Sequence, residues 1–278
     1  MAGRFRAEAR RGLHVRSGDG LFRRLPRRGR ELPQRRRLWR GKQLRKLRLR
    51  ALEGEHVTAT PDFEAAKVFL FKHLAASRAA EGAKRYRYEH CLRVARIGRR
   101  VAQAAGLDVA ALELGCLLHD IGKYDAAVPV DHGRAGALVV KDYFAQAGFT
   151  APVADEIVQG IAMHVDGRCN PRDDEGTDRD AAGRPYLTFV GEPSVLAKSI
   201  GDCDNIDRFS TYRIADTLRY MDFMNKTTAQ QRDFAADYLN NLRQQYDYAC
   251  STTPAHEMWI ANLDHQWEFF TKLQAELG

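Results

Sequence analysis

Side chains that could bind metal ions are scattered along this sequence, far from one another. They are four imidazoles and two carboxylates: His90, His119, Asp120, His132, His164 and Asp204. Imidazole and carboxylate ligands together suit divalent first-row metals, whereas structural zinc sites are usually rich in Cys. No local loop could gather positions this far apart, so separate helices would have to converge. The sequence therefore predicts a metal-dependent enzyme, and a hydrolase before any other class.

The adjacent pair His119-Asp120, in the segment LLHDIGK, is the centre of this prediction. Neighbouring residues in a regular helix diverge by about 100°, but at a helix end both can face one cavity. Asp120 is the best bridging ligand because its two oxygens can bind two cations. One metal would be held by His90, His119, Asp120 and Asp204, and the second by Asp120, His132 and His164. Two metals about 3.5–4 Å apart can activate a shared water.

Residues next to these positions could contact a substrate. Lys123 follows the pair by about one turn, and we assign Asp120 and Lys123 the catalytic roles; Lys123 could instead be a solvated Lys at a helix C-terminus. Arg208 and Asn205 are further candidates for substrate binding, since Arg suits bidentate phosphate recognition. Arg208 could also simply pair with a neighbouring Asp. For the last metal ligand, Asp202 and Asp207 compete with Asp204, which we prefer.

Apolar spacing and capping residues predict helices along most of the chain, and strand signals are nearly absent. The first helix would begin with Thr60 as N-cap and Pro61 at its first position. The others are expected at 85–105, 109–120, 133–147, 153–164, from Pro193 through Asp204, and at 227–248 and 254–276. The polar segment 166–191 predicts a long loop. The predicted fold class is all-α, with one helical domain over 57–278.

The positive net charge of +8 is concentrated at the N-terminus. Residues 1–55 carry 19 basic and 5 acidic side chains, whereas the remainder carries 25 basic and 31 acidic ones. Blocks of like charge repel one another and predict a disordered basic arm over 1–56. Such an arm could contact nucleic acid weakly through phosphates. Alternatively it is an appendage from an over-extended reading frame, with the natural protein starting near Val57.

Cysteine usage and hydropathy bear on location. The five Cys form no C-x-x-C pair, and their odd number suits a reducing compartment. No apolar run approaches the roughly 18–20 residues that span a membrane, and no apolar stretch follows the basic N-terminus as it would in a secretory signal. We therefore expect a cytoplasmic protein without a membrane partner.

The motifs resemble the HD superfamily of metal-dependent phosphohydrolases. His90, the His119-Asp120 pair and Asp204 reproduce its H…HD…D signature, and the likeness extends over about 85–210. The segments DHGRAGA and IAMHVDG look like the extra His segments of dinuclear members. The resemblance implies an HD-type helical bundle, here with additional C-terminal helices. It also implies two divalent ions (Fe, Mn, Mg or Zn) and attack by a metal-bridged hydroxide on a nucleotide-like phosphate.

Two other classes of function remain open. Some HD-superfamily members with a similar order of ligands are di-iron oxygenases, which oxygen uptake by the ferrous protein would reveal. A non-enzymatic nucleotide sensor or nucleic-acid-associated module is the other alternative, although a degenerate domain would be expected to lose ligands. The sequence lacks the GYP motif of one cyclic-dinucleotide subclass, and it lacks a second His beside His164.

Overall fold

The computed structural model describes residues 61–171 and 176–278. Over these residues the chain is all-α, with one isolated bridge between Arg179 and Pro185 and no β-strand. The prediction of an all-helical fold is therefore confirmed. None of the helices in this part of the chain has the length and apolar character that crossing a membrane requires. The basic arm predicted at 1–56 lies outside the described residues.

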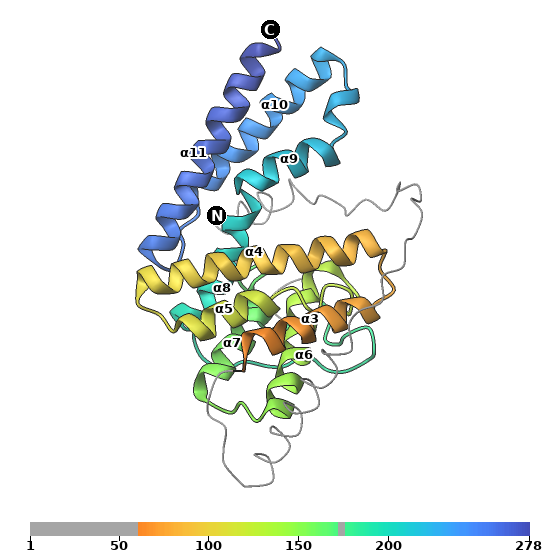
Figure 1. Ribbon diagram of the computed structural model, residues 1–278, viewed down its shortest axis with the longest axis vertical. Helices are drawn as coiled ribbons and strands as arrows, with labels where there is room; N and C mark the ends of the chain where they lie inside the picture. Colours follow the sequence, from red (N-terminus) through yellow and green to blue (C-terminus); the bar gives the residue numbers. More distant parts are fainter. Residues whose placement is uncertain (1–60, 172–175) are drawn as a thin grey trace, which may run out of the picture.

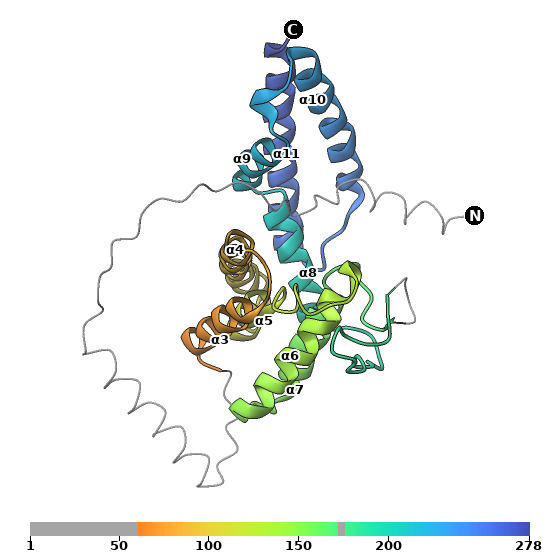
Figure 2. The ribbon, with the colours of Figure 1, turned by 90° about the vertical axis from the view of Figure 1, so that its right-hand side faces the viewer.

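The helices fall into a body and an extension (Figure 1). The body contains α3 (Phe63–Ala76), α4 (Glu81–Ala105), α5 (Val109–Leu118), α6 (His132–Ala147), α7 (Pro152–Met163) and α8 (Val195–Arg208), with the 3-10 turn η1 (Pro129–Asp131) before α6. The extension contains α9 (Thr211–Tyr220), η3 (Phe223–Asn225), α10 (Thr228–Arg243), η4 (Gln244–Asp247) and α11 (Thr253–Glu276). The helix α8 connects the two parts (Figure 2).

Side-chain caps set where several helices begin. Asp108 and Ser194 accept hydrogen bonds from the backbone N–H groups of Ala111 and Ala197, as N-caps do. The predicted cap at Thr60 was wrong, because Asp62 accepts from the backbone N–H of Ala65 and the helix α3 begins at Phe63. Asp62 stands next to the first apolar residue of the helix and satisfies one of its free N–H groups.

Other predicted boundaries also needed correction. The helix expected at 85 begins one turn earlier, at Glu81. The helix expected at 109–120 ends at Leu118, so that the His-Asp pair lies in the following turn. The helix α9 was not predicted, and the helix expected at 227–248 ends at Arg243 and continues as η4. The α9 segment is only ten residues long, but its apolar residues Ile214 and Leu218 lie four positions apart, a helical signal that the sequence analysis overlooked.

The main core lies between α4, α5, α7 and α8. Leu112, Leu117, Ile157, Ile161 and Ile200 are completely buried within it. At Gly98, an added Cβ would lie 2.6 Å from the sulfur of Cys116. The absence of a side chain there lets α4 approach α5 closely. This close packing fixes the position of the turn after α5, which carries His119 and Asp120.

A second, smaller core holds the extension together. Its buried members are Ile214, Ala235, Tyr238, Leu239 and Phe270. At its lower end, the amide of buried Gln266 donates to the carbonyl of Phe209 and accepts from the hydroxyl of Tyr238. The extension thus has a core of its own, while the first part of α11 packs into the main core through Ala255, Trp259 and Leu263.

Replacing Phe270 with Ala is expected to destabilise the protein by about 3–5 kcal/mol, because a fully buried ring leaves a cavity in this small core. Urea unfolding measures the change. The control is Phe71→Ala on α3, where the ring is 57% exposed and the expected change is within about 0.5 kcal/mol. Equal effects in the two variants would show that the second core contributes little to stability.

Candidate metal centre

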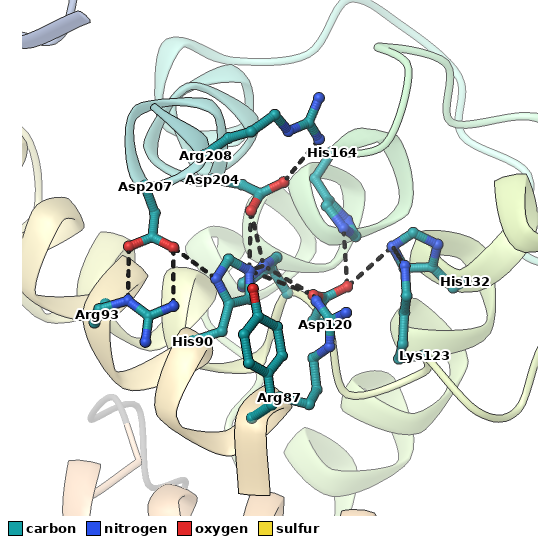
Figure 3. A network of polar contacts seen from close by, with 12 residues as sticks. Arg87, His90, Arg93, Asp120, Lys123, His132, His164, Asp204, Asp207 and Arg208 are labelled. Atoms are coloured by element: carbon teal, nitrogen blue, oxygen red, sulfur yellow. Dashed lines mark hydrogen bonds and ion pairs between the residues drawn. The ribbon is translucent and has the colours of Figure 1, made fainter. Parts of the chain in front are cut away.

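The structure brings all six candidate ligands into one cluster between the helices of the body; Figure 3 labels all of them except His119. His90 comes from α4, and His119 and Asp120 come from the turn after α5. His132 is the first residue of α6, His164 follows α7, and Asp204 lies one turn before the end of α8. Their side chains are at most 13% exposed. The convergence expected from the sequence is therefore present in the fold.

All four imidazoles use the same ring atom to anchor themselves. The Nδ1 atoms of His119, His132 and His164 lie 2.8, 2.5 and 2.7 Å from the backbone carbonyl oxygens of Cys116, Pro129 and Ile161. In each case the acceptor stands three residues before the ring. The Nδ1 of His90 lies 2.8 Å from an oxygen of Asp207. Because these oxygens accept, each Nδ1 donates a hydrogen, which leaves Nε2 free to bind a cation.

The Nε2 atoms face the two carboxylates of the cluster. That of His90 lies 3.0 Å from Asp204 Oδ1 and 3.2 Å from the Nε2 of His119. On the other side, the Nε2 atoms of His132 and His164 lie 2.9 and 3.6 Å from Asp120 Oδ1. Asp120 thus lies between the two pairs of imidazoles, as a bridging ligand would.

The residues present fit a divalent cation. Asp120 Oδ1 is buried and accepts no hydrogen bond, and a buried polar atom without a partner is rare in proteins. Its nearest neighbour, the Nε2 of His132, also presents a lone pair, since Nδ1 of that ring carries the hydrogen. Two facing lone pairs repel each other unless a positive charge lies between or beside them.

Two groups in the described residues are compact enough to hold an ion. One contains His90, His119 and Asp204, and the other contains His119, Asp120 and His164; within each group, the coordinating atoms lie within 4.8 Å of one another. The sequence-based division placed Asp120 in both groups, whereas the compact groups share His119. His132 belongs to neither group and reaches the cluster through Asp120.

The carboxylates strongly favour positive charge in the cluster. Burial lowers the pKa of His90, but hydrogen bonds with Asp120, Asp204 and Asp207 outweigh it and raise the value to about 9. His132 behaves in the opposite way: burial and the nearby charge of Lys123 lower its pKa to about 4. Burial raises the pKa of Asp120, but the positive charges around it hold the value well below the usual range.

Three cationic side chains lie against this cluster. The Nζ of Lys123 is 3.5 Å from the Nε2 of His132, and the guanidinium of Arg208 is 3.5 Å from Asp204. Both were candidates for substrate binding, and both lie at the site. Arg87 was missed by the sequence analysis, although it donates to Asp120 from α4. Its position one helical turn before His90 is the signal that could have identified it.

The two faces of α8 separate the competing acidic residues. Asp202 accepts from the hydroxyl of Tyr248 and the backbone N–H of Ser251, so both its oxygens are used away from the cluster. Asn205 lies near Tyr248, the partner of Asp202, and none of the contacts described here for the cluster involves it. Among the acidic candidates, the contacts favour Asp204 as the last ligand.

Asp207 lies behind His90 and orients its ring. Besides contacting His90, its carboxylate accepts two hydrogen bonds from Arg93, at 2.9 and 3.2 Å. The guanidinium of Arg93 in turn lies 4.1 Å from the centre of the Tyr212 ring on α9. Neither Asp207 nor Arg93 was assigned this role from the sequence, where charged residues on a helix resemble solvent-exposed ones.

Asp207→Asn is expected to weaken divalent-metal binding roughly 10- to 100-fold, because an amide orients the His90 ring less strongly than a carboxylate. Isothermal titration with Mn²⁺ measures the change. The matched control is Asp202→Asn, which alters a similarly buried carboxylate on the other face of α8 and should leave metal affinity unchanged. A similar loss in both variants would argue for general destabilisation instead.

Glycines allow α6 to approach both α7 and the turn that carries Asp120. A Cβ added at Gly133 would lie 2.7 Å from the carbonyl oxygen of Ile161, and one at Gly122 would lie 2.5 Å from that of His132. Gly136 faces Gly122 across the same contact. These close approaches bring His132 beside Asp120, so the glycines of DHGRAGA and LLHDIGK are part of what builds the site.

Two of three comparisons with known proteins found a match. The chain matches the HD domain family over residues 87–208. No curated protein matches it in sequence. A crystal structure of a predicted HD superfamily hydrolase from an uncultured Thermotogales bacterium is similar in fold, with a TM-score of 0.51 and 18% identity, over 78% of this chain and 94% of that one. The matched segment contains His90, His119, Asp120 and Asp204, and the resemblance seen in the sequence is confirmed: this chain carries an HD domain.

Proposed function

We propose that this protein is a metal-dependent phosphohydrolase that acts on a small, nucleotide-like phosphorylated substrate. The observation that most supports the proposal is the common orientation of the four imidazoles, each with Nδ1 held by an oxygen and Nε2 turned toward Asp120 or Asp204. This donor set suits a divalent ion. The HD domain, and the likeness to a protein described as a predicted HD superfamily hydrolase, support hydrolysis as the reaction.

In this proposal the ions are held by the six residues of the cluster: His90, His119, Asp120, His132, His164 and Asp204. Divalent ions in such a site supply Lewis acidity, which lowers the pKa of water and polarises a phosphoryl oxygen. Asp120 keeps the two halves of the cluster together. Lys123, beside His132, presents its ammonium group to an oxygen of the substrate. Arg208, whose side chain is 52% exposed, binds substrate at the edge of the site.

Cations around the cluster support phosphate as the reacting group. Lys123, Arg208 and Arg87 all lie within contact of candidate metal ligands. Charge developing on phosphoryl oxygens is stabilised by such groups when they are fixed in advance in a buried site. The preference for a nucleotide rests on the resemblance found in the sequence, and it is the part of the proposal that a substrate panel tests most directly.

The experiment is phosphate release by the full chain with Mn²⁺ or Fe²⁺, over nucleotides, dinucleoside polyphosphates and simple phosphate esters. We expect release that depends on the metal, stops on chelation and returns when metal is restored. Intact metal binding with no phosphate release over the whole panel would contradict the proposal. Oxygen consumption by the ferrous protein with an organic substrate would then identify the chain as an oxygenase.

A further inference from the structure

Arg87 reaches the cluster with part of its hydrogen-bonding capacity unused. Its guanidinium donates to Asp120 Oδ2, and the side chain of Tyr124 lies nearby. The side chain is only 16% exposed, and its Nε is buried without a partner. An unpaired buried donor on a charged group is unfavourable unless a ligand completes it.

A metal ion would compete with Arg87 for the same oxygen. Asp120 Oδ2 lies 3.4 Å from the Nε2 of His90 and 3.5 Å from that of His119, so an ion bound by these imidazoles is close to it. Two positive charges at one carboxylate oxygen repel each other. Metal binding therefore weakens the pairing of Arg87 with Asp120 and leaves a charged fork facing the site.

The balance of charge indicates which kind of ligand the guanidinium of Arg87 would bind. Arg87, Lys123 and Arg208 already outnumber the carboxylates Asp120 and Asp204, and every divalent ion adds to the positive excess. Asp207 does not offset it, because Arg93 pairs with that carboxylate. A ligand with two negative charges offsets this excess more than a ligand with one, and the planar guanidinium matches the spacing of phosphate oxygens.

We propose that Arg87 binds a phosphate oxygen of the substrate, and that the site selects phosphate groups carrying two negative charges, as a monoester or a terminal phosphate does. This inference rests on the proposed function and specifies its substrate class. A singly charged diester would leave the positive charge of the site less fully balanced and is expected to bind more weakly.

The test compares Arg87→Gln with Arg85→Gln, an exposed Arg on the same helix, in the full chain loaded with Mn²⁺. Titration with inorganic phosphate is expected to show a dissociation constant raised roughly 10- to 100-fold in Arg87→Gln, since one charge-assisted interaction is lost. Arg85→Gln should resemble the unaltered chain. Mn²⁺ should bind to Arg87→Gln as tightly as before or more tightly, because a competing cation is gone.

Each remaining outcome bears on the proposal. Unchanged phosphate binding in Arg87→Gln would overturn it, and so would loss of Mn²⁺ and phosphate binding together, which indicates a structural role. Should Arg87→Gln fail to fold, Arg87→Lys keeps the charge without the fork and must still weaken phosphate binding. If the unaltered chain neither binds phosphate nor hydrolyses any ester, the proposed function fails; if it does both and Arg87→Gln is unaffected, only the role of Arg87 fails.

Discussion

Replacing Asp120 with Asn is expected to weaken binding of divalent metal roughly 100- to 1,000-fold, the size of effect seen when a buried charge loses its partner. Metal-dependent phosphate release should fall below detection with it. The physical reason is position: Oδ1 faces His132 and His164, whereas Oδ2 faces His90 and His119. An amide keeps the shape of the side chain but removes the negative charge that both halves of the cluster share.

Isothermal titration with Mn²⁺ measures this change, and circular dichroism verifies that the variant is folded. Asp216→Asn is the matched control. Asp216 also pairs with arginines, Arg213 and Arg219, but it lies on α9 outside the cluster. It should bind Mn²⁺ like the unaltered chain. Tight Mn²⁺ binding by the Asp120 variant would mean that the other residues form the site without a bridging carboxylate.

Gly122→Ala is expected to destabilise the protein by about 3 kcal/mol or more, which exceeds the typical cost of overpacking because the obstacle is backbone. The new Cβ would overlap the backbone nitrogen of Gly136 and lie 2.5 Å from the carbonyl oxygen of His132. To relieve this overlap, α6 must move away from the turn that carries Asp120. For a chain of this size the melting temperature should fall by roughly 6–12 °C, and metal affinity should fall too.

Thermal unfolding followed by circular dichroism tests this prediction, with Gly82→Ala as the control. Gly82 lies in α4, and a Cβ added there meets nothing within 4 Å. That substitution should be neutral or should stabilise the protein by up to about 1 kcal/mol. A Gly122 variant as stable as the Gly82 variant would show that α6 and the turn can separate at little cost.

The chemical types in the cluster were readable from the sequence because imidazole and carboxylate side chains are uncommon at helix ends in apolar surroundings. His119 and Asp120 stood out for this reason, and the fold class followed from the periodicity of the surrounding segments. The choice between Asp202 and Asp204 was harder. It depends on how α8 is rotated against its neighbours, and packing determines that rotation.

The residues that support the cluster were the least predictable. Arg87 and Arg93 lie one turn on either side of His90, and on a basic helix they resemble ordinary surface charges. Asp207 was considered as a ligand, whereas the structure places it behind the His90 ring. Asp207 contacts His90 and Arg93, which lie 117 and 114 residues before it in the sequence. The spacing of residues in one sequence does not show which distant positions come into contact.

Three of the four imidazoles are held by backbone carbonyl oxygens, and this has a consequence for how the protein tolerates mutation. Every residue type supplies a carbonyl, so the side chains at Cys116 and Ile161 can change without removing the acceptor that His119 and His164 use. Only His90 depends on a side chain, that of Asp207. Substitutions around the centre therefore leave the acceptors of three imidazoles in place. Substitution of Asp207, in contrast, would remove the acceptor of His90 on α4.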